Sequence, residues 1–336
     1  MPQRAGGRRR EIALGVSLIV LLLAGAGALH FWLTGQGAKE PPARAVAVIP
    51  PVLPQATPPA AVVPPPAPAT PVAPEAQPVP PPTPPAAEAP PHPAEEPTWL
   101  RNATPSPQAG AKPRIAIVID DCGLDRPRTD RAIALPAAVT LSFLPYSNDL
   151  PSQTEAARRN GHELLVHVPM QPINARLDMG PNGLAIDQPR DEVLRRLRWD
   201  LGRFDGYVGI NNHMGSRFTT DRQAMTWVIG ELRSRGLMFL DSRTIGSTVG
   251  ESVASLEDVP YAGRDVFLDD DLQAQAVEAR LMDAEAVARR KGTAIAIGHP
   301  HDATLAALNQ WIATLPHAGI VLVPLTDVVR ARSTAE

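Results

Sequence analysis

Between Pro113 and Arg332, short runs of apolar, mostly β-branched residues alternate with longer amphipathic segments. An apolar run without a polar break is typical of a strand buried on both faces, as in a parallel sheet covered by helices. The pattern predicts strands at Ile115–Ile119, Val139–Leu144, Leu164–Val168, Tyr207–Ile210, Leu237–Leu240, Val266–Leu268, Ala294–Ile297 and Ile320–Val323, and helices at Ser152–Arg159, Arg190–Arg203, Asp221–Arg235, Leu272–Arg290 and Ala303–Thr314. This β-then-α rhythm predicts an α/β fold with a parallel sheet or a (β/α) barrel.

Residues 1–11 form a basic segment that contains Arg4 and Arg8–Arg10. The apolar run Ile12–Leu29 and the aromatic residues after it predict a transmembrane signal anchor at residues 12–33. Because the arginines are expected to stay cytoplasmic, the rest of the chain should lie beyond the inner membrane, in the periplasm or outside the cell. A cleavable signal peptide is the alternative, since Ala24–Ala28 offers small-residue cleavage sites; the length of the apolar run favours the anchor.

Residues 34–112 are rich in proline and alanine and contain most of the 39 prolines of the chain. They have too few large apolar residues to form a core, so we expect a disordered linker. In an extended polyproline conformation this linker would reach on the order of 200 Å and carry the next domain away from the membrane. The remaining stretch, residues 113–332, has the length of a single domain.

Charge and cysteine content exclude some classes of function. The formal net charge of −3 gives no indication of nucleic-acid binding. Cys122 is the one cysteine of the 336 residues, which excludes an intramolecular disulfide and a zinc cluster built on cysteines.

Polar side chains follow the predicted strands at the ends that share one face of a parallel fold. Asp120 and Asp121 follow the first strand, and adjacent carboxylates repel each other unless a metal ion or a shared proton relieves the repulsion. Other strand ends carry His167, Asn211–His213, Asp241, Asp269–Asp271, His299 and His301. This recurrence predicts a metal or acid/base site. The alternatives are a solvated Asp-Asp turn that caps the next helix and, for Asp269–Asp271, a helix N-terminus or a second metal site.

Several separated motifs resemble those of the NodB-like polysaccharide deacetylases. Ile119–Asp121 is similar to the first motif of that family, Gly161–His167 to the motif that ends in the first metal-binding histidine, and Ile297–His299 to the final strand-plus-histidine motif. Segments that resemble the divergent branch of the family are Leu141–Pro145, His167–Gln171, Gly180–Gly183, Asn211–Ser216 and Gly298–His301. The resemblance covers nearly all of residues 113–332 and implies a distorted (β/α)7-type barrel.

The sequence departs from the main family in two places. A second histidine follows the first in that family, and Gln171 occupies its position here. The Arg-x-x-Pro-Tyr motif of the family has no clear match. We infer that His213, at the end of the next predicted strand, supplies the missing metal ligand.

The resemblance implies a metal-dependent hydrolase that removes N- or O-acetyl groups from an envelope polysaccharide such as peptidoglycan. Zn²⁺ or another divalent transition metal would be held by Asp121, His167 and His213, a set that leaves a position for water. Asp120 would be the general base, and His299 would protonate the leaving amine. The residues expected to bind the substrate are Arg217, Asp241 and His301.

A second hypothesis is that the domain is a degenerate deacetylase that binds glycan or a cell-envelope protein without turnover. Gln171 and the missing arginine motif favour this hypothesis. A bound metal with a water that faces an open cleft would favour the enzyme, whereas a cleft filled by side chains would favour the binding module. For Arg217 and Asp241, surface salt bridges are the alternative to a role in the site.

Overall fold

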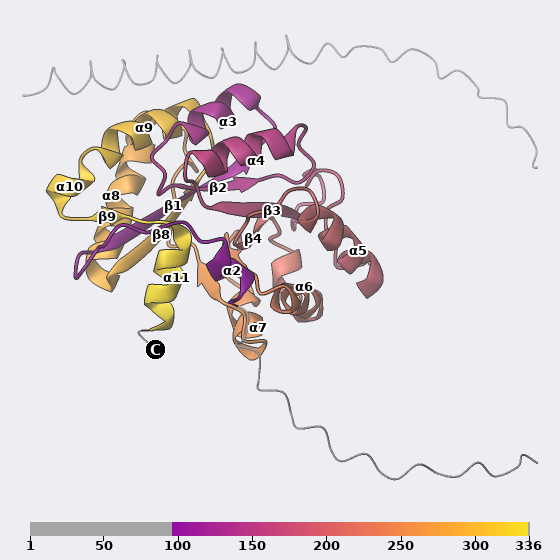
Figure 1. The fold of residues 1–336 in the computed structure, drawn as a ribbon. Coiled ribbons are helices and arrows are strands. Elements are labelled where there is room, and N and C mark those ends of the chain that lie inside the picture. Colours follow the sequence, from indigo (N-terminus) through magenta and orange to yellow (C-terminus); the bar gives the residue numbers. More distant parts are fainter. Residues whose placement is uncertain (1–95, 335–336) are drawn as a thin grey trace, which may run out of the picture. The chain divides into compact units, whose positions relative to one another are not determined.

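The computed structural model describes residues 96–334, which form an α/β domain built on one parallel sheet (Figure 1). The strand order is β6-β5-β4-β3-β2-β1-β8-β7, and β9 pairs with β1 beside this path. The strands are β1 (Arg114–Cys122), β2 (Thr140–Phe143), β3 (Leu164–Met170), β4 (Gly209–Met214), β5 (Met238–Asp241), β6 (Tyr261–Gly263), β7 (Val266–Phe267), β8 (Thr293–Gly298) and β9 (Val321–Leu322). The predicted parallel α/β class is confirmed, and the sheet curls into a half-barrel that is consistent with the deacetylase type.

The central strand, β1, is apolar on both faces. Ile115, Ile117 and Ile119 pack into the large core shared with the outer helices. Ala116 and Val118 belong to a smaller apolar cluster on the other side of the sheet. This double burial fixes the register of β1, because a shift by one residue would exchange the two sets of side chains.

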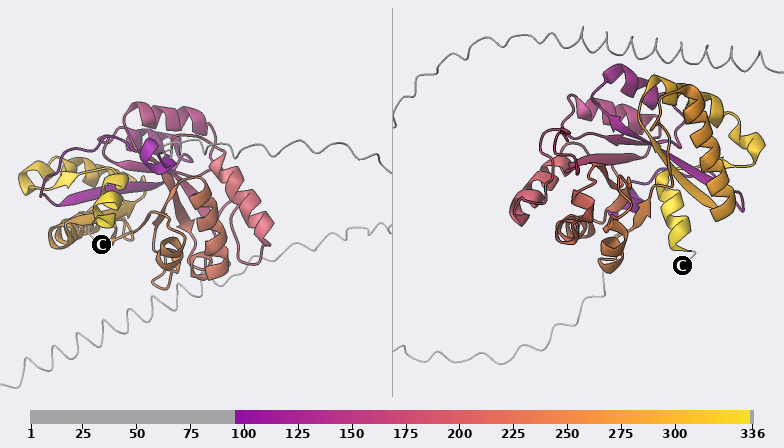
Figure 2. Two further views of the ribbon diagram at one scale, coloured as in Figure 1. Left: turned by 60° about the horizontal axis from the view of Figure 1, so that its bottom comes forward. Right: turned by 180° about the vertical axis from the view of Figure 1, so that it is seen from behind.

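Two groups of helices cover the two sides of the sheet (Figure 2). The outer group packs on the large core and comprises α3 (Arg126–Ile133), α4 (Leu150–Arg159), α5 (Arg190–Leu201), α6 (Arg222–Ser234), α7 (Gly250–Leu256), α8 (Ala274–Lys291), α9 (Asp302–Ile312) and α10 (Leu315–Ala318). The inner side is closed by α2 (Thr98–Arg101) and α11 (Leu325–Ser333), which bring Trp99, Val328 and Val329 to the smaller cluster.

The two edge strands of the sheet, β6 and β7, are consecutive in the chain and are separated by Arg264 and Asp265 alone. The backbone N–H of Arg264 donates to the carbonyl of Asp241 on β5 at 3.0 Å, and that of Asp265 donates to the carbonyl of Ile295 on β8 at 2.9 Å. These two residues therefore tie the ends of the curled sheet together.

The predicted strands and helices are present, with ends that differ by a few residues. The pattern missed β6, a three-residue strand with the sequence Tyr-Ala-Gly, because so short a segment shows no periodicity. It also missed α3, half of whose residues are charged, and the short helices α7 and α11.

Folded structure begins before the predicted boundary at Pro113. Trp99 is buried, and its backbone N–H donates to the carbonyl of Gly236 at 2.8 Å. The side-chain amide of Asn102 donates to the carbonyl of Tyr207 at 2.8 Å. The part of the predicted linker around Trp99 and Asn102 thus packs on the domain.

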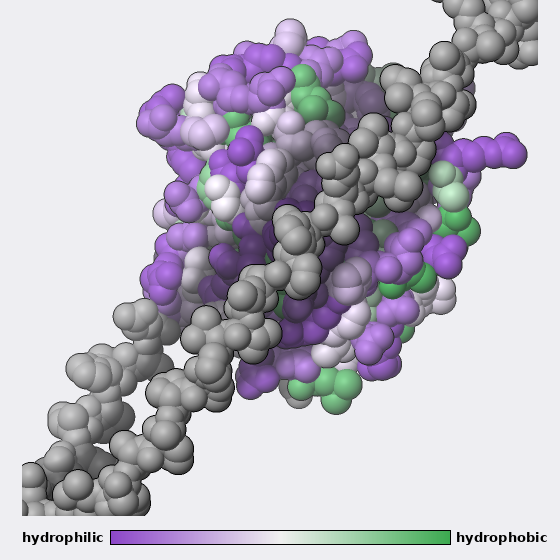
Figure 3. Space-filling model, turned by 90° about the vertical axis from the view of Figure 1, so that its right-hand side faces the viewer, coloured by the Kyte–Doolittle hydropathy of each residue, from purple (hydrophilic) through white to green (hydrophobic). Residues whose placement is uncertain are grey.

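The predicted basic segment (1–11), the anchor (12–33) and most of the linker (34–112) lie outside the described residues. Among the helices of residues 96–334, none combines the length and the hydrophobicity that crossing a bilayer requires. On the face seen in Figure 3, hydrophilic residues dominate and hydrophobic residues form small, separate groups.

Asp200, on the inner face of α5, is a buried carboxyl group with one satisfied oxygen. Its Oδ1 accepts a hydrogen bond from the Asn182 amide at 2.8 Å, whereas its Oδ2 has no hydrogen-bond partner. Burial raises the pKa of Asp200 to about 8. The folded protein therefore holds a proton here that the unfolded chain releases near pH 4.

We expect the free energy of unfolding to fall as the pH rises from about 4 to 8, because ionisation of Asp200 favours the unfolded chain over this range. Asp200→Asn should remove this dependence and raise the free energy of unfolding at pH 8 by on the order of 2–5 kcal/mol. Denaturant unfolding at pH 5 and pH 8 measures both effects. Asp191→Asn, on the exposed side of the same helix, is the control; equal pH slopes in the two variants would contradict the prediction.

Candidate metal centre

The two aspartates at the end of β1 stand where the strand becomes irregular. The register of β1 against β2 shifts between Ile119 and Cys122, and Asp121 has a left-handed backbone with φ of 55°. In a regular strand, adjacent side chains point to opposite faces. Here both carboxylates approach the same imidazole nitrogen, His167 Nε2, at 3.7 Å from Asp120 Oδ2 and 3.3 Å from Asp121 Oδ1. The irregularity therefore aims both acids at one point.

Two neighbouring strands bring the histidines to the same point. His167 lies on β3 and His213 near the end of β4, and the parallel register sets Pro169 opposite His213. The two rings meet edge to face, with centroids 5.0 Å apart.

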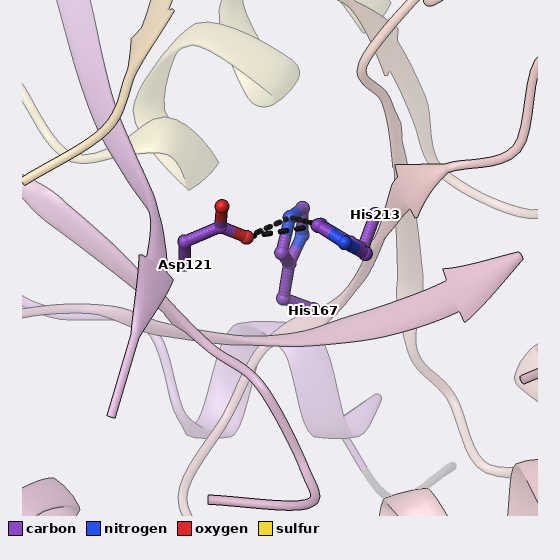
Figure 4. A group of neighbouring side chains, drawn as sticks. All are labelled: Asp121, His167 and His213. Atoms are coloured by element: carbon purple, nitrogen blue, oxygen red, sulfur yellow. Dashed lines mark hydrogen bonds and ion pairs between the residues drawn. The ribbon is translucent and has the colours of Figure 1, made fainter. Parts of the chain in front are cut away.

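Asp121, His167 and His213 thus converge, although three different strands carry them (Figure 4). Asp121 Oδ1 lies 2.9 Å from His213 Nδ1 and 3.3 Å from His167 Nε2, and the two nitrogens are 3.3 Å apart. Tetrahedral zinc with bonds of about 2.0–2.1 Å requires ligand atoms about 3.3 Å from one another.

Asp121 Oδ1 is buried and makes no hydrogen bond of normal geometry, although two ring nitrogens are close to it. A cation at the centre of the triangle would satisfy this oxygen. One carboxylate and two imidazoles are also a common ligand set for zinc and related divalent ions. The residues present therefore fit a metal ion with further positions open.

The two adjacent acids have different electrostatic surroundings. Burial raises the pKa of Asp120, although His167, His299 and the hydrogen bond from Asn211 act against this shift. Burial acts in the same direction on Asp121, but the imidazoles of His167 and His213 outweigh it and hold the pKa of Asp121 well below its ordinary range. Asp121 is the stable anion, and Asp120 is the one that more readily takes up a proton.

Asn211 connects Asp120 to His167. Its amide nitrogen donates to both oxygens of Asp120, at 2.8 and 3.0 Å, and its Oδ1 lies 2.8 Å from His167 Nδ1. Because an amide oxygen only accepts, Nδ1 of His167 donates to it, and Nε2 is the nitrogen that faces Asp121 and can bind a metal ion once it is deprotonated. The sequence places Asn211 at this strand end but does not show that it sets the tautomer of His167.

His299 approaches from β8 and is held by Asp269. Its Nδ1 lies 3.0 Å from Asp269 Oδ1, and its backbone N–H donates to Oδ2 at 2.6 Å. Its Nε2 points toward the acids, 3.9 Å from Asp121 Oδ2. Burial disfavours the imidazolium, but the bond to Asp269 and the charge of Asp120 outweigh burial and raise the pKa of His299 to about 9.

The interaction between Asp269 and His299 does not follow from the sequence pattern, which indicates a helix N-terminus or a second metal site for Asp269–Asp271. Asp269 groups with His299 and His301, yet both of its oxygens already accept hydrogen bonds, including one from the Thr304 hydroxyl at 2.8 Å. We therefore infer that Asp269 orients the imidazole of His299 and is not a metal ligand.

The three residues predicted to bind substrate occupy different surroundings. Arg217 is exposed, and its backbone N–H donates to the carbonyl of Gln171. Asp241 is fully buried and accepts from the Thr248 hydroxyl at 2.7 Å and from the backbone N–H of Arg243 at 2.8 Å, so it shapes the loop after β5. His301 is partly buried, with its ring centroid 5.8 Å from that of His299.

Gln171, at the position of the missing family histidine, faces away from the centre. Its Oε1 accepts from the backbone N–H of Ile186 at 3.0 Å and so anchors the loop after β3. His213, and not Gln171, lies beside His167 and Asp121.

An open cavity of about 440 Å³ lies beside the triangle, within the usual range for small-molecule sites. Acidic and imidazole side chains line one part of it, and two arginines and a phenylalanine line another. The first part is formed by Asp120, His167, His213 and His299, and the second by Arg243, Arg264 and Phe267.

The curled parallel sheet brings the acids and the paired histidines together in a group that could hold a metal ion. Residues 117–329 match the family model described as divergent polysaccharide deacetylase. The chain therefore belongs to the divergent polysaccharide deacetylase family.

The chain is also similar to uncharacterized proteins of three bacteria. The chain is 37% identical over 203 residues to the uncharacterized protein YibQ of Escherichia coli (strain K12), covering 60% of this chain and 63% of that protein, less than two thirds of its length. It is 34% identical over 206 residues to an uncharacterized protein of Haemophilus influenzae, covering 61% and 73% respectively. The crystal structure of the uncharacterized protein ATU2773 from Agrobacterium tumefaciens superimposes with a TM-score of 0.67 at 30% identity, covering 69% of this chain and 94% of that one.

Proposed function

We propose that this protein is a metal-dependent hydrolase that removes N- or O-acetyl groups from an envelope polysaccharide. The observation that carries the proposal is the triangle of Asp121, His167 and His213, with a buried oxygen that lacks a hydrogen bond and an open cavity beside it. Family membership points to the same class of chemistry.

When bound, Zn²⁺ or a similar ion would polarise the acetyl carbonyl and make water more acidic. Asp120, beside the triangle, would accept the proton of the water that attacks the carbonyl carbon. His299 would donate a proton to the leaving nitrogen or oxygen as its bond to that carbon breaks, and Asp269 would keep the imidazole aimed at it. The products are acetate and the free amine or hydroxyl.

The binding module without turnover stays the alternative. The absence of the family arginine motif and the presence of Gln171 favour it, because both remove groups that the active enzymes of the resemblance use. The open cavity favours the enzyme, since side chains do not fill the space beside the triangle.

We further propose that residues 12–33 anchor the protein in the inner membrane, with residues 1–11 in the cytoplasm and the domain in the periplasm or outside the cell. Peptidoglycan is then the polymer within reach, and a cell-envelope protein is a further candidate partner. A topology reporter fused after Glu336 tests this arrangement. Activity of a reporter that works only in the cytoplasm would contradict it.

Metal analysis combined with an acetate-release assay tests the hydrolase. We expect the purified chain to bind about one equivalent of zinc, to lose acetate release on chelation and to regain it when zinc is restored. Acetate release that persists after the metal is removed would contradict metal dependence. Tight metal binding without acetate release from any acetylated glycan would favour the binding module.

A further inference from the structure

The cavity beside the triangle is also lined by two arginines that the proposed hydrolysis does not use. Arg243 follows β5, and Arg264 is the residue between β6 and β7. Both line the same cavity as Asp120, His167 and His299. The cavity thus combines two positively charged side chains with the acids and histidines of the candidate metal site.

The guanidinium of Arg264 is held rigidly. Its Nε donates to the carbonyl of Ser242 at 2.6 Å and its Nη2 to the carbonyl of Arg243 at 3.0 Å. The group also stacks on Phe267, with Cζ 4.8 Å from the ring centroid. Its plane is therefore fixed, while Nη1 makes no hydrogen bond to the part of the chain that the structure describes.

Arg264 is also a partly buried cation without a carboxylate partner. Within residues 96–334 it forms no ion pair, and its two hydrogen bonds go to neutral carbonyls. Burial lowers the pKa of Arg264, although the charges of Asp120, Asp241 and Asp270 act against this shift from beyond ion-pair distance. A buried cation of this kind is stabilised when an anion arrives.

The loop after β5 holds Arg243 in a defined backbone conformation. Its backbone is left-handed, with φ of 47°, and the buried carboxylate of Asp241 accepts its N–H. Its side chain passes over Gly263, where an added Cβ would collide with Nε. Its guanidinium pairs with the exposed Glu251 at 3.4 Å, and surface pairs of this kind contribute little. The charge of the buried Asp241 also acts on this guanidinium.

We propose that Arg264 and Arg243 bind an anionic group of the substrate, so that the acetylated sugar carries a carboxylate close to the acetyl group. Guanidinium groups with fixed planes recognise the paired oxygens of such an anion. This inference rests on the proposed hydrolase, because it names the substrate class of the same cavity. A phosphate presents similar oxygens, and the test separates the two.

Matched sugars that differ in charge test the proposal on the zinc-loaded full chain. N-acetylmuramic acid is compared with its neutral methyl ester, and N-acetylglucosamine 6-phosphate with N-acetylglucosamine. Calorimetric titration gives the Kd, and acetate release gives kcat/KM. We expect the acid to bind about 10- to 100-fold more tightly than the ester. A preference of that size for the phosphorylated sugar alone would overturn the carboxylate assignment.

Variants of the two arginines test whether these residues cause the preference for the acid over its ester. Arg264→Gln and Arg243→Gln should each lower the acid-to-ester preference at least about 10-fold. Arg264→Lys keeps the charge but loses the planar pair of N–H donors, so its preference should lie between those of the wild type and Arg264→Gln. Arg195→Gln, on the exposed side of α5, is the control. Thermal melting identifies a variant that does not fold, and Arg243→Gln, on a more exposed side chain, then carries the test.

Two results would overturn the anion site: equal binding of acid and ester, or a preference that neither variant changes. Binding is measured separately from turnover, so the two proposals can fail separately. A chain that prefers the acid but releases no acetate would contradict the hydrolase and leave the anion site standing.

Discussion

Replacing His213 with alanine is expected to weaken zinc binding by more than about 100-fold. Loss of an outer partner of a ligand already costs about 10- to 100-fold in affinity, and His213→Ala removes a ligand itself. The remaining carboxylate and single imidazole, Asp121 and His167, do not satisfy zinc alone. Competition titration with a chromophoric chelator measures the Kd for zinc. Acetate release should fall as the affinity for zinc falls.

Two control variants show whether the change in Kd is specific to the triangle. His317→Ala changes an exposed histidine near the end of α10 and should leave the Kd unchanged. The double variant His213→Ala, Gln171→His restores a histidine at the family position, but residue 171 points toward Ile186 and should not rescue binding. Full affinity in His213→Ala would show that the ligand assignment is wrong.

Much of this arrangement was predictable because parallel strands end on one face. Asp121, His167 and His213 each follow or end an apolar run, so a parallel sheet brings them to one edge whatever the exact loops. The resemblance added the ligand set and the exchange of Gln171 for His213. The structure brings their ligand atoms within 4.8 Å of one another; their roles in binding metal stay predictions.

The supporting contacts were not predictable, because they depend on atomic details that no sequence period encodes. Asn211 reaches Asp120 and His167 only through the register of β4 against β3. Asp269 reaches His299 because β7 pairs with β8.

Two other features were hidden for different reasons. Arg264 lies between β6 and β7 and lines the cavity. Its position could not be predicted because β6 is too short to show a pattern. Trp99 lies in a proline-rich stretch whose composition resembles a linker, and its bond to Gly236 and its place in the smaller apolar cluster show that it belongs to the domain.

Replacing Asp120 with asparagine is expected to leave zinc bound and to reduce kcat about 10²- to 10⁴-fold, the usual contribution of a general base. The amide has the size of the carboxylate, and its oxygen still accepts from Asn211. The orientation of His167, set by the other end of Asn211, should therefore survive. What is lost is a buried carboxylate whose raised pKa suits it to take a proton from water.

The measurement pairs zinc stoichiometry with single-turnover acetate release, so that binding and chemistry are read separately. Asp125→Asn, at the exposed N-cap of α3, is the matched control and should change neither the zinc stoichiometry nor the rate of acetate release. Loss of zinc in Asp120→Asn would make Asp120 a ligand and revise the triangle. Unchanged turnover with zinc bound would exclude Asp120 as the base. The other group that the proposed mechanism uses for proton transfer is His299, whose pKa is raised to about 9, and its bond to Asp269 favours the imidazolium, a state suited to donating a proton rather than taking one.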